Sequence, residues 1–303
     1  MTREKKYFNV SQIVFWALIA LLIILFIVKS DWGLFDEGRF ARNYITNDSI
    51  NKIAIEEETD KIDGPDTALI KRTWQWKSFD GKTYSFRFSI PKQEYESSKM
   101  TRLKSRPDHS CWNAMFEHDK KGLKIMVDAY KNIIKEYQLD YMQAMQMVVS
   151  SAQNFDYTYI TINQQPCRDI EDNNGNKPST DCKPKPYPHS CCDNVAPFAV
   201  YSPIEYAVNG AGDCDTKSLF AMTILKCLNM GFDAEMLFGE VEAGHHAMLG
   251  ICVPNPPYRT LYANDLRTGK RYYAWECTQR SDNAELGAPV WRIFKNWRVH
   301  PIR

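Results

Sequence analysis

The sequence predicts an α+β fold in which one buried helix packs on an antiparallel sheet. Residues 214–228 are apolar on nearly every side of a helix, and Gly231 marks its end. Four runs with strand character follow, at 232–241, 245–253, 259–262 and 271–278. Because no helical pattern separates these runs, they should pair as antiparallel neighbours. A short helix and a final strand are expected in the remainder.

Composition excludes some classes of protein. The chain has 303 residues, of which 44% are hydrophobic and 13% aromatic, enough for an ordinary packed core. Lys and Arg number 38 and Asp and Glu number 37, so the formal net charge is only +1. This balance favours neither a nucleic-acid partner nor an acidic surface.

The N-terminus predicts a membrane anchor over residues 1–29. Residues 13–28 form an uninterrupted apolar run, and with 8–12 they approach the ~20 residues that cross a bilayer. Basic residues precede this run and acidic residues follow it: Arg3, Lys5 and Lys6 before, Asp31, Asp36 and Glu37 after. The positive-inside rule then predicts a single-pass membrane protein with a cytoplasmic N-terminus and a periplasmic or extracellular main domain. A cleaved signal peptide is the alternative, although the run slightly exceeds the usual ~7–15 residues.

Residues 30–68 have the mixed polar and acidic composition of a membrane-proximal linker, which leaves 69–303 as the main domain. This domain should open with a β-hairpin over 69–91. Large and polar residues alternate in 73–78 and in 83–90, and Asp80-Gly81 between them suits a tight turn.

Two helices should follow the hairpin. Apolar residues recur at intervals of three and four over 120–138, which predicts an amphipathic helix. A second helix is expected over about 141–153. Its methionines are interpreted as core filler rather than as a cofactor or partner site.

Residues 161–200 show no periodicity, which predicts an inserted surface loop. Four of the nine cysteines lie in it: Cys167, Cys182, Cys191 and Cys192. We interpret these four as disulfide candidates in an oxidising compartment, because they lack the paired Cys-x-x-Cys spacing of a zinc site. No metal or other cofactor is expected. The loop could form a wall or lid over a cleft.

Three short motifs carry candidate chemistry: 212–218 (Gly-Asp-Cys-Asp-Thr-Lys-Ser), 244–249 (Gly-His-His-Ala-Met-Leu) and 273–278 (Tyr-Ala-Trp-Glu-Cys-Thr). Asp213 suits an N-cap, so Cys214 should occupy the first turn of a helix, where the macrodipole favours a thiolate. His246 on the next strand could take the thiol proton, and Glu276 could orient the imidazole. Strand alternation turns His245 to the other face.

These residues resemble the transglutaminase-like branch of the papain-like cysteine enzymes over about residues 140–280. That family carries Gly-Asp-Cys at a helix start, His-Ala on the following strand, and an acidic residue followed closely by Thr on the strand after that. The lead-in 201–212, with Pro203-Ile204-Glu205 and Gly210-Ala211-Gly212, is similar to that of bacterial and archaeal members. The chain departs from the pattern in having Glu276 where Asp is commoner, and in its long insertion. The resemblance implies a papain-like core with Cys214, His246 and Glu276 as the triad.

The expected chemistry is attack of Cys214 on an amide carbonyl of a protein or peptide, such as one of the cell envelope, through a thioester. Resolution by water would make the chain a protease or amidase, which we favour, and resolution by an amine would make it a crosslinking transglutaminase. A non-catalytic binding or assembly module on the same fold is a further alternative. The Cys214 N–H is the first candidate oxyanion donor, with Asn209 or Tyr206 as a second. Asp215 is a candidate supporting residue near the helix start.

Overall fold

The computed structural model describes residues 68–105, 110–157, 159–160, 191–192, 200–241, 244–278 and 285–302. All of them belong to one compact unit, Asp48–Arg303. The predicted anchor, nearly all of the predicted linker and most of the predicted insertion lie outside the described residues, so the domain bounds stay predictions. Within the described ranges, no helix combines the length and the apolar character needed to cross a bilayer.

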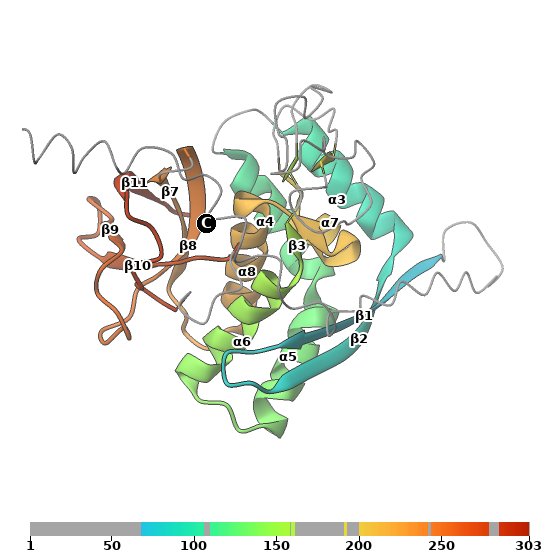
Figure 1. Cartoon of the computed structure of the whole chain (residues 1–303). Helices are drawn as coiled ribbons and strands as arrows, with labels where there is room; N and C mark the ends of the chain where they lie inside the picture. Colours follow the sequence, from blue (N-terminus) through green and yellow to red (C-terminus); the bar gives the residue numbers. More distant parts are fainter. Residues whose placement is uncertain are drawn as a thin grey trace, which may run out of the picture. The chain divides into compact units, whose positions relative to one another are not determined.

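The described chain is α+β, as expected, and its main sheet has five antiparallel strands (Figure 1). Their spatial order is β11 (Lys295–His300), β7 (Ala234–Val241), β8 (Gly244–Ile251), β10 (Arg271–Trp275) and β9 (Tyr262–Asn264). The predicted strands at 232–241, 245–253 and 271–278 are confirmed with slightly shorter bounds. The strand predicted at 259–262 was misplaced, because β9 begins only at Tyr262, the last residue of the predicted range. The final strand is present, and residues 285–294, the described part of the stretch before it, contain no helix.

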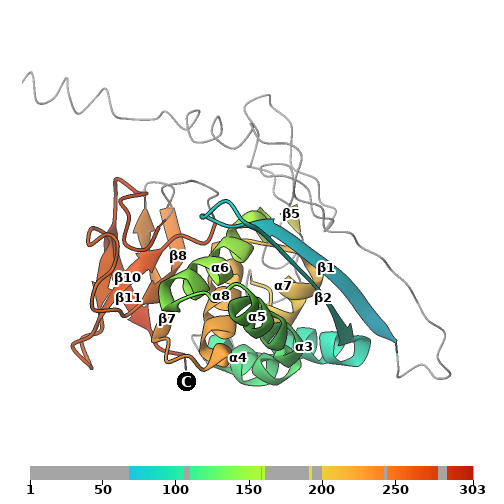
Figure 2. The same ribbon diagram turned by 90° about the horizontal axis from the view of Figure 1, so that it is seen from below.

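Helix α8 (Cys214–Leu228) is the centre of the molecule's core. Figures 1 and 2 show it between the sheet and the other helices. Its Leu219, Phe220 and Ile224 side chains are fully buried, and the left-handed Asn229 ends it, two residues before the predicted Gly231. A helix that is apolar on all sides needs neighbours on all sides, and this one has the sheet on one side and helices on the other.

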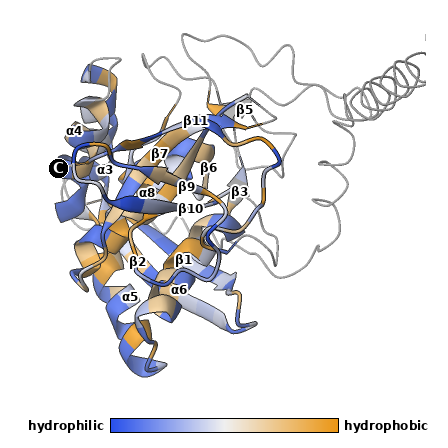
Figure 3. Ribbon diagram, turned by 90° about the vertical axis from the view of Figure 1, so that its left-hand side faces the viewer, coloured by the Kyte–Doolittle hydropathy of each residue, from blue (hydrophilic) through white to orange (hydrophobic). Residues whose placement is uncertain are grey.

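The surrounding helices are α3 (Lys92–Lys104), α4 (Ser110–Gly122), α5 (Lys124–Glu136), α6 (Tyr141–Asn154) and α7 (Pro203–Asn209). The predicted helix at 141–153 is confirmed as α6, and its N-terminus carries a capping box between Asp140 and Gln143. The single helix predicted over 120–138 was wrong at its start. The chain instead ends α4 at Gly122 and begins α5 at Lys124, and Figure 3 shows both hydrophobic and hydrophilic colour on α5.

The predicted hairpin is present. Strands β1 (Leu69–Lys77) and β2 (Thr83–Pro91) pair antiparallel, with Trp74 opposite Phe86. Trp74 and Trp76 are fully buried. Their indole N–H groups donate to the Ala207 carbonyl at 3.2 Å and to Ser150 Oγ at 3.1 Å, so the hairpin packs on α7 and α6.

Two short parallel ladders lie at the base of the insertion. Strand β3 (Asp156–Tyr157) pairs with β6 (Ala211–Gly212), and β4 (Tyr159–Ile160) pairs with β5 (Cys191–Cys192). The chain that enters the insertion is therefore hydrogen-bonded to the two residues that precede Asp213 and Cys214.

Candidate active site

Cys214 is the first residue of α8, as expected. The Asp213 side chain caps the helix by accepting a hydrogen bond from the Thr216 N–H at 3.3 Å. The Cys214 N–H thus belongs to the first turn, where backbone donors have no partner within the helix. The sulfur is half-buried and is a free thiol. Position and oxidation state both leave it able to act as a nucleophile.

Gly212 is required by close packing at the helix start. A Cβ at this position would lie 2.5 Å from the Thr216 side chain and 3.1 Å from the Tyr206 ring. The lead-in is fixed as well, because Ser202 and Glu205 form a capping box at the N-terminus of α7 and the left-handed Gly210 ends that helix. The segment before Cys214 is therefore a tightly packed turn between two capped helices.

His246 and Glu276 meet at one end of the main sheet. His246 lies near the start of β8, and Glu276 directly follows the last residue of the neighbouring strand β10. The imidazole Nε2 is 2.7 Å from Glu276 Oε2. Since Nε2 faces the carboxylate, Nδ1 is the ring nitrogen left to serve the sulfur.

Glu276 is held by more than the imidazole. Its Oε1 accepts hydrogen bonds from the Thr278 N–H at 2.8 Å and the Thr278 hydroxyl at 2.6 Å. Its Oε2 accepts a second bond, from the Trp291 indole N–H at 2.7 Å. Gln153 donates to the Glu276 backbone carbonyl at 2.6 Å. Both carboxylate oxygens are thus satisfied in a site that is almost fully buried.

The roles of Trp291 and Gln153 were missed from the sequence. Trp291 is fifteen positions beyond Glu276 and Gln153 is in α6, 123 positions before it. No local spacing links residues so far apart. The Trp291 ring also packs edge-on against the imidazole, with centroids 5.1 Å apart. The Thr278 contact corresponds to the Thr of the third motif.

The charges of the site reinforce one another. Burial by itself lowers the pKa of His246, but the charges of Glu276 and Cys214 and their hydrogen bonds to the ring outweigh it and raise that pKa well above its usual range. The sulfur is therefore within interaction range of the imidazole. Burial also opposes ionisation of Glu276, yet His246 and Thr278 lower the pKa of this carboxyl to about 2. The imidazole consequently favours its protonated form beside a permanent carboxylate.

A second pair of carboxyls flanks the nucleophile. Asp213 and Asp215 both direct Oδ1 at the Thr216 N–H, at 3.3 and 3.2 Å. Burial, together with the adjacent Asp215 charge, raises the pKa of Asp213 well above its usual range, and burial also raises the pKa of Asp215. The pair therefore retains a proton to higher pH than two separate carboxyls would. The supporting position expected for Asp215 is seen as this helix-start contact.

Tyr206 and Asn209 were the two candidates for the second oxyanion donor. The Tyr206 hydroxyl donates to the Ala152 carbonyl at 3.0 Å from a fully buried position in the aromatic core. The hydroxyl proton is thus directed at a backbone carbonyl, and an oxyanion role for Tyr206 stays a prediction. Asn209 ends α7, and its Oδ1 accepts from the Tyr95 hydroxyl at 3.4 Å. Its proposed role stays a prediction, as does that of the Cys214 N–H.

Three other expectations concern cysteines, metals and His245. His245 is exposed, as strand alternation suggested. Cys167 and Cys182 lie outside the described residues, and only the backbone of Cys191 and Cys192 is described, so the disulfides stay predictions. In the described parts of the chain, no group of three or more His, Cys, Asp or Glu residues is arranged to hold a metal ion.

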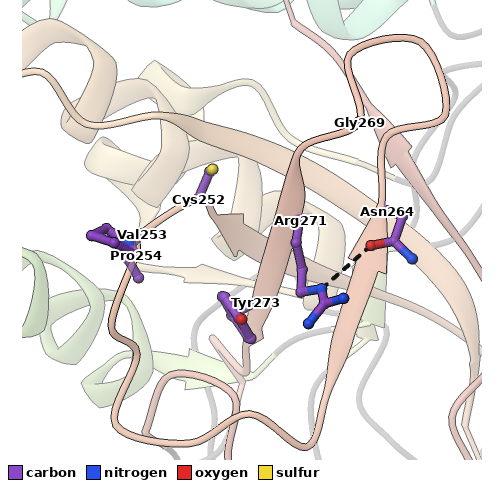
Figure 4. Close-up of a pocket in the computed structure, with 7 residues that line it drawn as sticks. All are labelled: Cys252, Val253, Pro254, Asn264, Gly269, Arg271 and Tyr273. Atoms are coloured by element: carbon purple, nitrogen blue, oxygen red, sulfur yellow. Dashed lines mark hydrogen bonds between the residues drawn. The ribbon is translucent and has the colours of Figure 1, made fainter.

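A pocket of about 490 Å³ lies elsewhere on the sheet (Figure 4). Cys252 and Arg271 line it, and they stand at the end of β8 and the start of β10. His246 and Glu276 stand at the opposite ends of the same two strands. The pocket is therefore separate from the candidate active site.

Comparison with family models, with curated proteins and with solved structures finds no match.

Proposed function

We propose that this chain is a transglutaminase-like cysteine enzyme that acts on amide bonds through a thioester. The observation that carries the proposal is the imidazole–carboxylate couple, in which Nε2 of His246 lies 2.7 Å from Glu276 beside the free thiol of Cys214. A nucleophile, a base and an orienting group within mutual range are the parts that covalent acyl transfer requires. That the core has a papain-like fold is part of the same proposal.

In the proposed reaction the Cys214 thiolate attacks the amide carbonyl while His246 holds the proton. The tetrahedral oxyanion would accept a hydrogen bond from the Cys214 N–H, which is in the first turn of α8. Collapse breaks the C–N bond, and His246 passes its proton to the departing amine. Glu276 keeps the imidazole in one orientation and stabilises its charged form throughout.

We propose that water resolves the thioester, which makes the chain a protease or amidase. Cys214 is only half-buried, so solvent has access to its side of the site. Selective aminolysis would require that water be kept away from the acyl group. His246, which has lost its proton to the amine, can then remove one from the attacking water as the new C–O bond forms. The C–S bond then breaks, which releases the carboxylic acid and restores the Cys214 thiolate beside protonated His246.

The test compares the full chain with its Cys214→Ala variant on peptide substrates, with and without an added primary amine. Ammonia, cleavage products and amine incorporation are followed by mass spectrometry. Cleavage that requires Cys214 supports hydrolysis, and incorporation that requires Cys214 identifies a crosslinker. Cys252→Ala is the matched control, because Cys252 is another half-buried thiol remote from His246. Turnover that survives Cys214→Ala contradicts the proposed nucleophile. No turnover of any amide contradicts the proposed activity and favours a binding module.

We further propose that residues 1–29 anchor the domain to a membrane, with the active site on the periplasmic or extracellular side. The support is the apolar run 13–28 with its basic N-terminal flank. Protease added to spheroplasts, in which the outer layers of the cell envelope have been opened and the cytoplasmic membrane is intact, should degrade the main domain. Protection of that domain until the cytoplasmic membrane is broken would contradict the proposed orientation.

A further inference from the structure

The pocket at the far end of the sheet has an arginine, Arg271, that is not neutralised by any acidic group among the described residues. Seven residues line it: Cys252, Val253, Pro254, Asn264, Gly269, Arg271 and Tyr273. Figure 4 shows the Arg271 side chain between Asn264 and Tyr273. Within the described part of the chain, Arg271 has no ion-pair partner. Two neighbouring cations differ from it, because Lys270 pairs with Asp233 at 2.7 Å and Arg267 with Asp265 at 3.2 Å.

The guanidinium of Arg271 is oriented by its neighbours. Its Cζ lies 4.3 Å from the centroid of the Tyr262 ring, a cation–π contact that covers one face of the planar group. Its Nε donates a long hydrogen bond to Asn264 Oδ1 at 3.5 Å. These two contacts fix the plane and leave the two terminal nitrogens to form the fork that matches a carboxylate.

The rest of the lining is largely apolar. Val253 and Tyr273 are buried, with exposed fractions of 8% and 6%, and Pro254 stands beside them. Ligand sites typically combine such an apolar lining with a few oriented polar groups. A ligand that matches this pocket would have an apolar group that ends in a planar anion.

We propose that this pocket binds a ligand carboxylate carried on an apolar group, with Arg271 as the recognition residue. The C-terminal residue of a peptide and a small organic acid share this chemistry. The site is independent of the reaction proposed above. About five strand residues separate Arg271 from Glu276, which at ~3.3 Å per residue is on the order of 16 Å.

The experiment measures binding of N-acetyl-leucine and of N-acetyl-leucinamide by saturation-transfer NMR titration. The two probes differ only in the carboxylate. The protein is the full chain carrying Cys214→Ala, so turnover does not enter and failure of the catalytic proposal leaves the result readable. We expect the acid to bind at least tenfold more tightly than the amide, and added salt to weaken that preference.

Arg271→Gln should remove the preference for the acid, and Arg271→Lys should keep part of it because the charge remains without the fork. The matched control is Arg259→Gln, an exposed arginine outside the lining, which should bind both probes like the parent. Arg271 is itself exposed, and a thermal melt verifies that each variant folds. Equal binding of acid and amide by the parent, or equal effects of Arg271→Gln and Arg259→Gln, would overturn the proposal.

Two leucine-terminated peptides, one with a free C-terminus and one amidated, distinguish the sources of the carboxylate. Tighter binding of the free form than of N-acetyl-leucine supports a peptide terminus as the ligand. Binding of N-acetyl-leucine alone supports a small organic acid.

Discussion

Trp291 donates its indole N–H to Glu276 at 2.7 Å, onto the same carboxylate oxygen that lies 2.7 Å from His246. One oxygen thus receives two donors from two separate segments. The indole also packs against the imidazole that it helps to orient. In the proposed mechanism, Trp291 is a positioning residue that acts through His246 and Glu276.

Trp291→Phe should lower kcat/KM for amide substrates about tenfold. The change keeps an aromatic ring against the imidazole and removes one hydrogen bond to a charged group, worth about 1.5–3 kcal/mol. Steady-state kinetics provide the measurement. The control is Trp297→Phe, whose indole donates to the Glu240 carbonyl instead. Equal losses in the two variants would contradict a specific role for Trp291.

Glu276→Gln should move the alkaline limb of the pH–rate profile to lower pH. Thiol attack requires the proton on His246, and Glu276 is a principal group that raises the pKa of this imidazole. Without the negative charge the ring loses its proton at lower pH, so activity should fall earlier as pH rises. The measurement is kcat/KM across pH for both proteins. An alkaline limb at the same pH in both would refute the assigned role of Glu276.

His118 should contribute stability that depends on pH. Its Nδ1 is 2.8 Å from the buried Asp119, and this hydrogen bond raises the pKa of His118 despite partial burial. Ser97 and Glu94 also face the ring. Because the folded-state pKa is raised, the contribution is complete below the unfolded value of about 6.5 and is lost as pH rises through the folded value.

His118→Gln should therefore reduce the free energy of unfolding by about 1 kcal/mol at pH 5.5 and by less at pH 9. Urea titrations at the two pH values provide the comparison. A loss that is larger at pH 9 has the wrong sign for this account.

Arg102 and Glu205 form a buried two-point ion pair, with contacts of 2.6 and 2.7 Å. Arg102→Met alone should cost about 3–5 kcal/mol of unfolding free energy, because it leaves a buried carboxylate without its partner. The double variant Arg102→Met, Glu205→Met should lose less than the sum of the two single changes. Urea unfolding of all four proteins measures the coupling. Strict additivity would show that the pair is not coupled.

The sequence predicted those features that depend on local pattern. The hairpin was predicted from the period-two alternation on both sides of Asp80-Gly81. Helix α8 was predicted from the apolar run that follows the N-cap residue Asp213. Helix α3 was not predicted, because Lys92–Lys104 is mostly polar and only Ser98 and Arg102 are buried on it. Helix α4 ends at Gly122, which packs so closely that a Cβ there would lie 2.6 Å from both Glu94 and Ile204. Such contacts join distant segments and leave no periodic signal.

The candidate site likewise combines residues that a local motif predicts with residues that only the tertiary fold brings together. Cys214, His246 and Glu276 were selected by motif, and the structure joins the last two by a 2.7 Å contact. Trp291 and Gln153 reach Glu276 only through the tertiary fold. Tyr206 was selected for its position near the nucleophile, but its hydroxyl donates to the Ala152 carbonyl in α6.

The most direct test of the central claim is the rate at which iodoacetamide alkylates each thiol at neutral pH. Cys214 should react fastest in the full chain, because burial raises the pKa of both Cys227 and Cys252, whereas Cys214 interacts with the imidazole of His246. His246→Ala should slow alkylation of Cys214, whereas the matched change at the exposed neighbour, His245→Ala, should not. Peptide mass spectrometry over time gives each rate. Alkylation of Cys214 no faster than that of Cys252, or equally fast with and without His246, would contradict the account.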